Sequence, residues 1–292
     1  EYVTKIEIKD DMKIVTTNIN AYESNNIIIA TGGLSYPITG STGDGYNFAK
    51  LTGHKVNECF PSLTALMPTV YDKNLSGLNL KNCAIKLIIG GNIVQDEFGD
   101  IDFTDNGLEG PLGLRISRKA VKALMNKEKV TVEIDLKSAL DLAKLKGRIE
   151  KELTENEQKT LENFLRGYLP APMINPILKL MKVSGNTKCG TLQYGFSSQF
   201  ANSIKSWRLE ISGYTSYERA VITAGGVDLN EIIAKNMKSK ICENLYFAGE
   251  LIDLDGDTGG YNLQIAFSTG ALAGHSAAHS ILTSGNSKPS DI

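Results

Sequence analysis

Several features that would assign this 292-residue sequence to a large class of proteins are missing. No apolar run approaches the ~20 residues that a membrane-spanning helix requires. Neither sign of charge is in large excess, because 31 Lys and Arg stand against 33 Asp and Glu. Composition therefore gives no electrostatic reason to expect nucleic acid or an anionic membrane as a partner. The first eight residues alternate like a β-strand, which is not the pattern of a signal peptide.

Cysteine is scarce and unpaired in the sequence. Cys59, Cys83, Cys189 and Cys242 stand singly, without the spacing of a zinc site or of a disulfide framework. We therefore expect reduced, mostly buried thiols in a cytoplasmic protein. The chain also begins without methionine, within an expected strand, which suggests a fragment or a processed product, or a start chosen for expression.

Three segments share one pattern, in which an apolar strand ends in glycine: residues 27–33, 220–226 and 245–249. The last continues through acidic residues to Gly259 and Gly260, which open a long helix rich in small residues. The N-terminus of such a helix offers free N–H groups and a positive dipole end, which suit a flat or anionic cofactor. We expect the three turns to meet. The G-x-G-x-x-G fingerprint of dinucleotide-binding proteins follows no strand.

A chain of this length can form two domains. Residues 3–17 predict a hairpin that turns at Asp10 and Asp11, and residues 27–29 suit a strand buried on both faces of a parallel sheet. From about Pro61, strands joined by glycine-rich turns predict a β-rich insert.

Helices are predicted by spacing and by capping residues. Residues 138–182 are expected to be helical, with Thr154 and Glu157 as a capping box. A short helix follows residues 40–45, with Thr42 or Asp44 as its N-cap and Gly53 at its left-handed end. The final helix, about residues 263–282, places small residues on one face.

Other chemical interpretations have weaker support. The acidic residues 253–257 suggest a calcium loop, but Thr258 and Gln264 occupy the places of its glycine and glutamate. We expect these carboxylates to accept hydrogen bonds from sugar-like hydroxyls instead. His275 and His279 have no third metal ligand nearby, so we expect surface residues and no metal site. No Ser/His/Asp or Cys/His arrangement supports a hydrolase.

Residues 30–46, 223–231 and 247–264 closely resemble the HI0933-like family. These bacterial flavoproteins are described as NAD(P)/FAD-dependent or aminoacetone-oxidase-like oxidoreductases, and they include a bile-acid reductase. Residues 107–111 resemble a short motif of the family's inserted domain. The resemblance runs through nearly the whole chain in the right order.

The resemblance implies an α/β fold: a truncated Rossmann-like FAD-binding domain interrupted by an inserted β-barrel plus helical domain. Residues 1–64 and 216–292 would form the FAD-binding domain, and residues 65–215 the insert. Members of the family begin with a strand, a G-x-G-x-x-G turn and a helix, so the resemblance also implies that this βαβ front part is missing.

The resemblance also implies which residues approach FAD. Near its phosphates or ribose it places Thr31, Gly32 and Gly33. Near the pyrophosphate and the ribityl hydroxyls it places Gly249, Glu250 and Asp253. Toward the N1–O2 edge of the flavin it directs the backbone N–H groups of Gly259, Gly260, Tyr261, Asn262 and Leu263. A helix N-terminus there would stabilise the negative charge that develops on reduction.

The resemblance thus suggests the C-terminal portion of an FAD-dependent oxidoreductase, which transfers hydride through flavin, with NAD(P)H as a candidate donor and an unsaturated or carbonyl compound as acceptor. Tyr36 and Tyr261 are candidate proton donors, although nothing in the sequence isolates an acid or base. We expect a small-molecule substrate, and we expect neither nucleic acid nor a membrane as a partner. A homo-oligomer is one option for the assembly of the chain.

Two rival hypotheses remain. The chain could be a catalytically inactive fragment without FAD that self-associates or needs its missing N-terminal part. It could also act on tRNA, as related flavoproteins do, although the near-neutral charge disfavours this function.

Overall fold

A computed structural model describes residues 1–9 and 12–285 of the chain. The chain forms two compact units, which we describe separately. The discontinuous unit consists of residues 1–63 and 216–292, and the insert consists of residues 64–215. None of the helices in the described part combines the length and the apolar character that crossing a bilayer requires.

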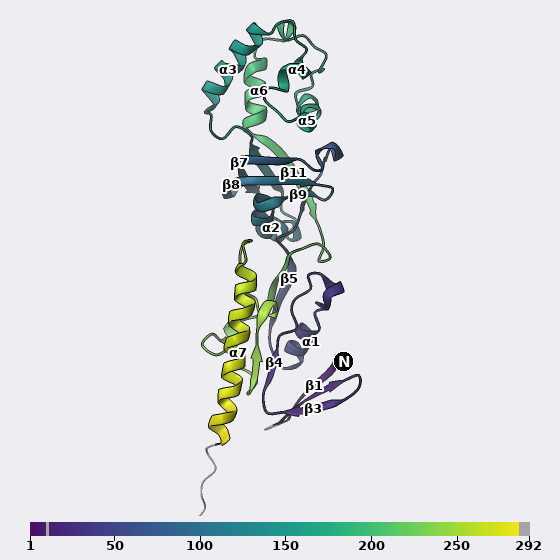
Figure 1. Ribbon diagram of the computed structural model, residues 1–292, viewed down its shortest axis with the longest axis vertical. Helices are drawn as coiled ribbons and strands as arrows, with labels where there is room; N and C mark the ends of the chain where they lie inside the picture. Colours follow the sequence, from purple (N-terminus) through teal and green to yellow (C-terminus); the bar gives the residue numbers. More distant parts are fainter. Residues whose placement is uncertain (10–11, 286–292) are drawn as a thin grey trace, which may run out of the picture. The chain divides into compact units, whose positions relative to one another are not determined.

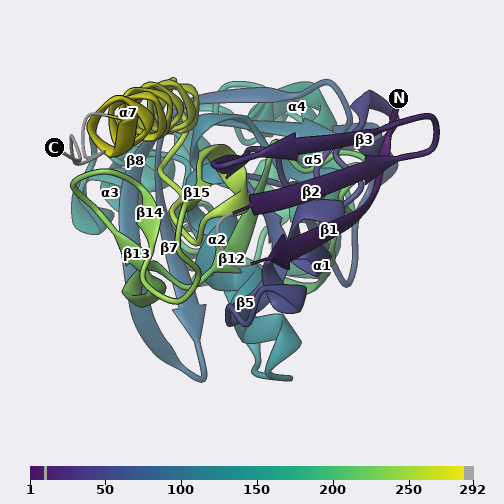
Figure 2. The same ribbon diagram turned by 90° about the horizontal axis from the view of Figure 1, so that it is seen from below.

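The discontinuous unit begins with a three-stranded antiparallel sheet, in the order β1 (Val3–Lys9), β2 (Met12–Thr17) and β3 (Ala21–Ser24) (Figure 2). Val3, Ile6 and Val15 pack against the buried core of this unit. The two strands of the hairpin expected over residues 3–17 are confirmed. The turn expected at Asp10 and Asp11 lies outside the described residues.

A four-stranded sheet provides the centre of the unit, in the order β13 (Ile232–Ile233), β14 (Lys238–Ser239), β15 (Leu245–Phe247) and β4 (Ile27–Ile29). Strands β15 and β4 are parallel, and the other pairs are antiparallel. Ile27 and Ile29 are buried, whereas Ile28 is 39% exposed. Burial of β4 on both faces was therefore wrong, because alternate side chains point to opposite faces and only one face packs into the core.

Helix α7 (Tyr261–Gly285) lies against β4 and β15 (Figure 1). Ala273 and Ala277 are buried in this contact. Small side chains let a helix approach a sheet closely, and the predicted small-residue face is confirmed. The remaining elements of the unit are η1 (Pro37–Thr39), α1 (Asp44–Leu51), an antiparallel pair of β5 (Val56–Ser62) with β12 (Ile222–Val227), η4 (Leu229–Glu231) and η5 (Gly249–Leu251).

The ends of α1 differ in part from the prediction. Its N-cap is Gly43, which has a φ of 81°. The Thr42 hydroxyl donates to the Asp44 carboxylate instead of capping a backbone N–H, so neither predicted N-cap was right. Gly53, with a φ of 87°, does close the helix in the left-handed conformation, as expected.

The insert contains a closed barrel, as the resemblance implied, and the barrel has six strands. Around the barrel the strands are β10 (Val130–Asp135), β11 (Trp207–Tyr214), β6 (Leu66–Pro68), β9 (Gly107–Glu109), β8 (Asn92–Thr104) and β7 (Asn79–Ile89). Helix α2 (Gly110–Met125) packs against all six strands, with Leu112, Ile116 and Ala120 fully buried. The helix thus fills the barrel with aliphatic side chains.

A helical part follows the barrel strands β6–β10 in sequence. Its elements are α3 (Leu142–Glu155), α4 (Leu161–Leu165), α5 (Ala171–Met181), η3 (Cys189–Thr191) and α6 (Phe196–Lys205), with η2 (Lys73–Leu75) contacting α5. The predicted capping box was wrong, because Thr154 lies in the last turn of α3 and donates to the carbonyl of Glu150. The side chain of Asp141 caps α3 through the N–H of Lys144.

The two ends of the insert are hydrogen-bonded to each other. The hydroxyl oxygens of Thr64 and Thr215 are 2.6 Å apart, and the N–H of Thr215 donates to the carbonyl of Ala65 at 3.0 Å. The chain therefore enters and leaves the insert at one point.

Candidate functional site

A cavity of about 410 Å³ lies within the discontinuous unit, beside the first turn of α7. One wall is aliphatic and consists of Leu63, which follows β5, of Val221 and Ile222 at the start of β12, and of Ile265 and Ala266 in α7. The polar side of the cavity carries Thr223, Glu250, Asp255, Thr258 and Asn262. Its volume falls in the range of small-molecule sites, and an apolar lining with a few polar groups is typical of them.

The three glycine turns meet beside this cavity, as the sequence predicted. The hydroxyl oxygen of Thr223 accepts hydrogen bonds from the N–H groups of Leu34 at 2.8 Å and Ser35 at 3.1 Å. Glu250 accepts from the N–H of Thr223 at 2.5 Å and from the N–H of Gly33. Gly33, Thr223 and Glu250 therefore connect three segments that are far apart in sequence. We call these residues the turn junction.

Gly33 is needed in the turn junction because of close approach. A Cβ at this position would lie 2.6 Å from Oγ1 of Thr223 and 3.0 Å from Cδ of Glu250. The neighbouring Thr31 packs its side chain against Gly45 of α1, where a Cβ would overlap Oγ1 of Thr31. The glycine turn that follows β4 is thus held by close packing at Gly33 and Gly45, and both positions admit only glycine.

Glu250 is the ionisable group of the turn junction. Its side chain is half-buried, and burial raises the pKa of its carboxyl above the ordinary value, against the opposing effect of the Thr223 and Gly33 N–H groups. Nearby, burial also raises the pKa of Tyr46, with further contributions from Cys59 and Glu250. The site therefore disfavours additional negative charge at these side chains.

The first turn of α7 supplies the opposite electrostatic character. Gly259 and Gly260, with φ values of 118° and 92°, lead into the helix and line the cavity. The side chain of Asn262 accepts from the N–H of Gly256 and donates to its carbonyl, both at 2.9 Å. This pair of bonds holds the preceding loop against the helix. The positive end of a 25-residue helix is thereby presented to the cavity.

The structure brings together only some of the residues predicted to bind the cofactor. Five of them line the cavity: Glu250, Gly259, Gly260, Asn262 and Leu263. Six others do not line it, namely Thr31, Gly32, Gly33, Gly249, Asp253 and Tyr261. Asp253 accepts from the side-chain amide of Asn57 at 2.8 Å, and the N–H of Gly249 donates to the hydroxyl of Thr269.

Two tyrosines were candidate proton donors, and both are strongly exposed. Tyr36 is 44% exposed and Tyr261 is 62% exposed. Neither lines the cavity, and within residues 1–9 and 12–285 neither hydroxyl makes a hydrogen bond.

Metal ligands do not cluster in the part of the chain that the structure describes, where no group of three or more His, Cys, Asp or Glu side chains could hold an ion. His275 and His279 lie on the exposed face of α7, as expected. His54 is buried instead, between the hydroxyls of Thr52 and Ser239.

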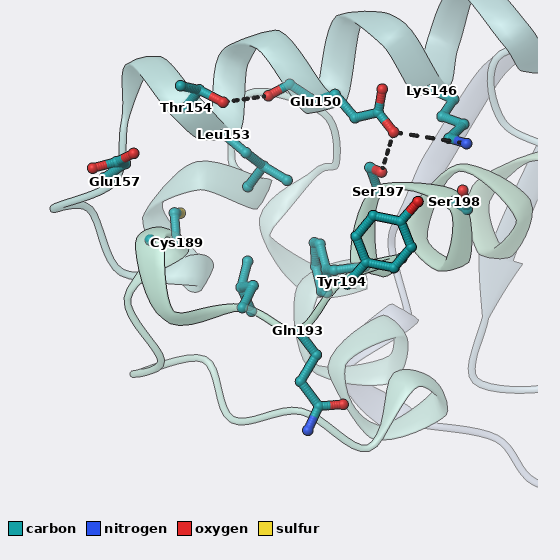
Figure 3. Close-up of a pocket in the computed structure, with 14 residues that line it drawn as sticks. Lys146, Glu150, Leu153, Thr154, Glu157, Cys189, Gln193, Tyr194, Ser197 and Ser198 are labelled. Carbon is teal, nitrogen blue, oxygen red and sulfur yellow. Dashed lines mark hydrogen bonds and ion pairs between the residues drawn. The ribbon is translucent and has the colours of Figure 1, made fainter.

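The insert has a cavity of about 390 Å³ between α3, η3 and the start of α6 (Figure 3). The carboxylate of Glu150 accepts from the hydroxyl of Ser197 at 2.9 Å and lies 3.7 Å from Nζ of Lys146. These polar groups are paired with one another, whereas the first cavity combines a helix N-terminus with the turn junction. We therefore place the candidate functional site in the discontinuous unit.

A family model of the HI0933-like protein Rossmann domain matches residues 1–276. The chain belongs to the HI0933-like family. The resemblance seen in the sequence is thereby confirmed, and so is the Rossmann character of its fold.

Three named proteins similar to this HI0933-like chain are of two kinds. The 3-dehydro-bile acid delta(4,6)-reductase of Clostridium scindens is 26% identical over 265 residues, which are 91% of this chain and 65% of that protein. The ribosomal RNA dihydrouridine synthase of Escherichia coli is 28% identical over 248 residues, 83% of this chain and 58% of that protein. Its counterpart from Haemophilus influenzae is 28% identical over 277 residues, with coverages of 91% and 65%. The chain spans less than two thirds of the length of each.

Sequence reasoning missed the central part that Thr223 plays in this HI0933-like site. The similar strand-end sequences Ala-Thr-Gly-Gly at residues 30–33 and Thr-Ala-Gly-Gly at residues 223–226 marked the segment, but nothing in one sequence indicates that this hydroxyl accepts two N–H groups from another turn. The apolar wall at Leu63, Val221 and Ile222 was also missed. Its only signal is the strand pattern, which does not say what a strand faces.

Proposed function

We propose that the discontinuous unit binds FAD and that the chain belongs to a flavin-dependent oxidoreductase. Residues 1–64 and 216–292 would then be the two parts of an FAD-binding domain. One observation carries this proposal: the positive end of α7 and the turn junction border one cavity of ligand size. The family membership supports it, because the matched family model describes a Rossmann domain.

The residues present fit a flavin. Gly249 and Gly260 have positive φ values and open space where a Cβ would be, so their backbones can approach a ligand closely. The aliphatic wall suits a flat ring system, and the first-turn N–H groups of α7 suit its N1–O2 edge. Thr31, Gly32 and Gly33 on one side, with Gly249, Glu250 and Asp253 on the other, remain the residues we propose for the phosphates and hydroxyls.

Bound FAD would supply hydride-transfer chemistry, and the chain would supply orientation and electrostatics. Asn262 would keep the start of α7 in place, so that its N–H groups are directed at the ligand before it binds. The wall at Val221, Ile222 and Ile265 would exclude water from one face. The polar side chains that line the cavity are the hydroxyls of Thr223 and Thr258, the amide of Asn262 and the carboxylates of Glu250 and Asp255, and we assign none of them as an acid or base.

For the substrate we propose a compound with a carbon–carbon double bond conjugated to a carbonyl. The names of the two kinds of relative, a 3-dehydro delta(4,6)-reductase and a dihydrouridine synthase, both denote reduction of such a bond. We propose NAD(P)H as the electron donor. The aliphatic lining and the near-neutral charge favour a small apolar molecule over nucleic acid.

The first test is a titration of the chain with FAD, followed by absorbance in the flavin band and by thermal stability. Saturable binding with a rise in melting temperature is the expected result. Gly260→Asp should weaken binding about ten-fold or more, because it adds negative charge and a Cβ at the helix start. Gly91→Asp is the matched control, because it introduces the same side chain at another exposed glycine, which also has a positive φ, 88°, and open space where a Cβ would be.

Activity is tested next, with NADH and NADPH as donors and two acceptors, a steroid enone and a ribosomal RNA fragment that contains uridine. Reduction of the enone alone supports the small-molecule proposal, and reduction of uridine alone overturns it. A cooperatively folded chain that binds no FAD would favour the rival hypothesis of an inactive fragment. Size-exclusion chromatography would then show whether the chain self-associates. We propose that the protein is cytoplasmic, and cell fractionation tests this proposal.

A further inference from the structure

A third cavity lies in the insert, and none of its lining residues belongs to the cavity beside α7 or to the cavity at Glu150. It has a volume of about 710 Å³ and is bordered by the loop through η2, by α5 and by β11. The indole of Trp207 and the side chains of Leu75 and Leu209 form a buried apolar base. The indole stacks on Phe103 with ring centroids 5.6 Å apart. The base is therefore buried and apolar and includes one aromatic ring.

The walls of this cavity that face solvent are aliphatic. Val70 is 84% exposed and Leu180, on α5, is 52% exposed, and both line the cavity together with Pro176. Exposed aliphatic side chains above an apolar base offer contact area to a hydrophobic body.

Charged residues form the rim, and the acidic ones are already engaged. Asp72 accepts from the backbone N–H and the side-chain amide of Asn74, and its second oxygen lies 3.5 Å from Nζ of Lys179. Glu210 lies 3.2 Å from Nζ of Lys129. These carboxylates have partners within the protein.

The basic residues of the rim are less fully engaged. Arg208 binds the carboxylate of Glu133 at 2.7 Å. The ammonium group of Lys73, however, makes no hydrogen bond or ion pair with any residue that the structure describes. The insert as a whole carries more basic than acidic side chains. The rim therefore has positive charge available for a ligand.

We propose that this cavity binds an amphipathic carboxylate, with its apolar body on Trp207 and between Val70 and Leu180, and its carboxylate beside Lys73. The site is independent of the flavin proposal, because every residue that lines it belongs to the insert. Complementary charge gives the orientation, and the buried apolar base gives most of the affinity.

The chain carries its own reporter for this site. Trp207 is the only tryptophan in the sequence, so tryptophan fluorescence and the single indole N–H resonance both come from one residue, which lines this cavity. The probe is decanoate, titrated below its micellar range, with decan-1-ol and decyltrimethylammonium as neutral and cationic counterparts of equal chain length. We expect saturable changes of both signals, with decanoate the tightest of the three.

Two exposed lysines of the insert provide a matched pair of variants. Lys73→Met should weaken decanoate binding roughly two- to five-fold and leave decan-1-ol binding unchanged, because an exposed ion pair contributes this much. Lys81→Met removes a lysine that does not line the cavity, so it should change neither the affinity for decanoate nor the affinity for decan-1-ol.

A third variant tests the apolar wall. Leu180→Glu should abolish the decanoate response, and its circular dichroism should match that of the unchanged chain because the side chain is exposed. Three results would each overturn the proposal: no saturable response at Trp207, binding of decan-1-ol or the cation as tight as that of decanoate, or equal effects of the two lysine substitutions.

Discussion

The carboxylate of Glu250 accepts a hydrogen bond from the backbone N–H of Thr223 at 2.5 Å. Thr223 in turn accepts two N–H groups from the turn that follows β4. One acidic side chain and one hydroxyl thus join segments that are about 190 residues apart in sequence. The stability of the candidate site depends on these few polar contacts, which makes it open to test by substitution.

Glu250→Gln should flatten the dependence of stability on pH. Burial raises the pKa of Glu250 above its ordinary value of 4.5, so the folded state holds the proton more tightly than the unfolded state does. The contribution of this group to the free energy of unfolding is therefore greatest below pH 4.5 and falls as pH rises through the folded-state pKa. Urea unfolding over a pH series measures this effect. Parallel profiles for the original chain and Glu250→Gln would contradict it, and Glu243→Gln, at a largely exposed position, is the control.

Thr223→Val should lower the free energy of unfolding by about 1–3 kcal/mol, because the N–H groups of Leu34 and Ser35 lose their acceptor where water has little access. Thr223→Ser keeps the hydroxyl and should cost much less. Denaturant unfolding of both variants makes the comparison. Equal losses would mean that the methyl group stabilises the junction as much as the hydroxyl does, and a loss with Thr223→Ser alone would mean that the hydroxyl contributes nothing.

Gly33→Ala should destabilise the discontinuous unit by about 1–3 kcal/mol, because the added Cβ would overlap Oγ1 of Thr223. Gly147→Ala serves as a control of opposite sign. Its Cβ would meet open space within α3, so we expect stabilisation by about 0.5–1 kcal/mol. Thermal and denaturant unfolding distinguish the two. A neutral Gly33→Ala would show that the turn can move aside.

Asn262→Ala should weaken FAD binding about ten-fold while the chain remains folded, because the loop at Gly256 and Asp257 loses its attachment to α7. Asn202→Ala removes a comparable side-chain bond to a backbone carbonyl on the exposed face of α6. It should leave FAD binding unchanged. Isothermal titration of both variants tests the pair, and an unchanged affinity for Asn262→Ala would show that the loop is not preorganised by this residue.

Ile116→Ala should destabilise the insert by about 2–5 kcal/mol, because the side chain is fully buried where α2 fills the barrel. Ile93→Ala, in the hairpin between β7 and β8, removes the same atoms from a 58% exposed position and should cost far less. Denaturant unfolding followed by the fluorescence of Trp207 in β11 reports on the barrel directly. Similar costs would mean that α2 contributes little to barrel stability.

Local patterns in the sequence were sufficient for the strand-and-glycine turns, because a buried strand followed by positive-φ glycines has a strong signature. They were also sufficient for a β-rich insert and for the small-residue face of α7, whereas the barrel was implied only by the resemblance to the family. They failed at Ile28, since a run of three isoleucines does not reveal that one face of β4 is uncovered. They failed again at Thr154, where a capping-box spacing occurs in the last turn of a helix instead of the first.

The candidate site was harder to predict than the elements that build it. Glycines and acidic residues marked the start of α7 and the position of Glu250, which do line one cavity. The partners of those residues come from distant segments: Asn57 for Asp253, Thr269 for Gly249 and Thr223 for Glu250. Such pairings depend on tertiary packing, and a single sequence carries no periodicity that would reveal them.

The bond between Thr64 and Thr215 has a consequence for how the chain reaches its folded state. Strand β5 must pair with β12 across the whole insert, and closing so long a loop of flexible chain costs entropy. A folded insert holds its own two ends side by side, so β5 and β12 then meet as the arms of a hairpin. The entropic barrier is therefore lowest when the insert folds first and the cofactor site assembles afterwards.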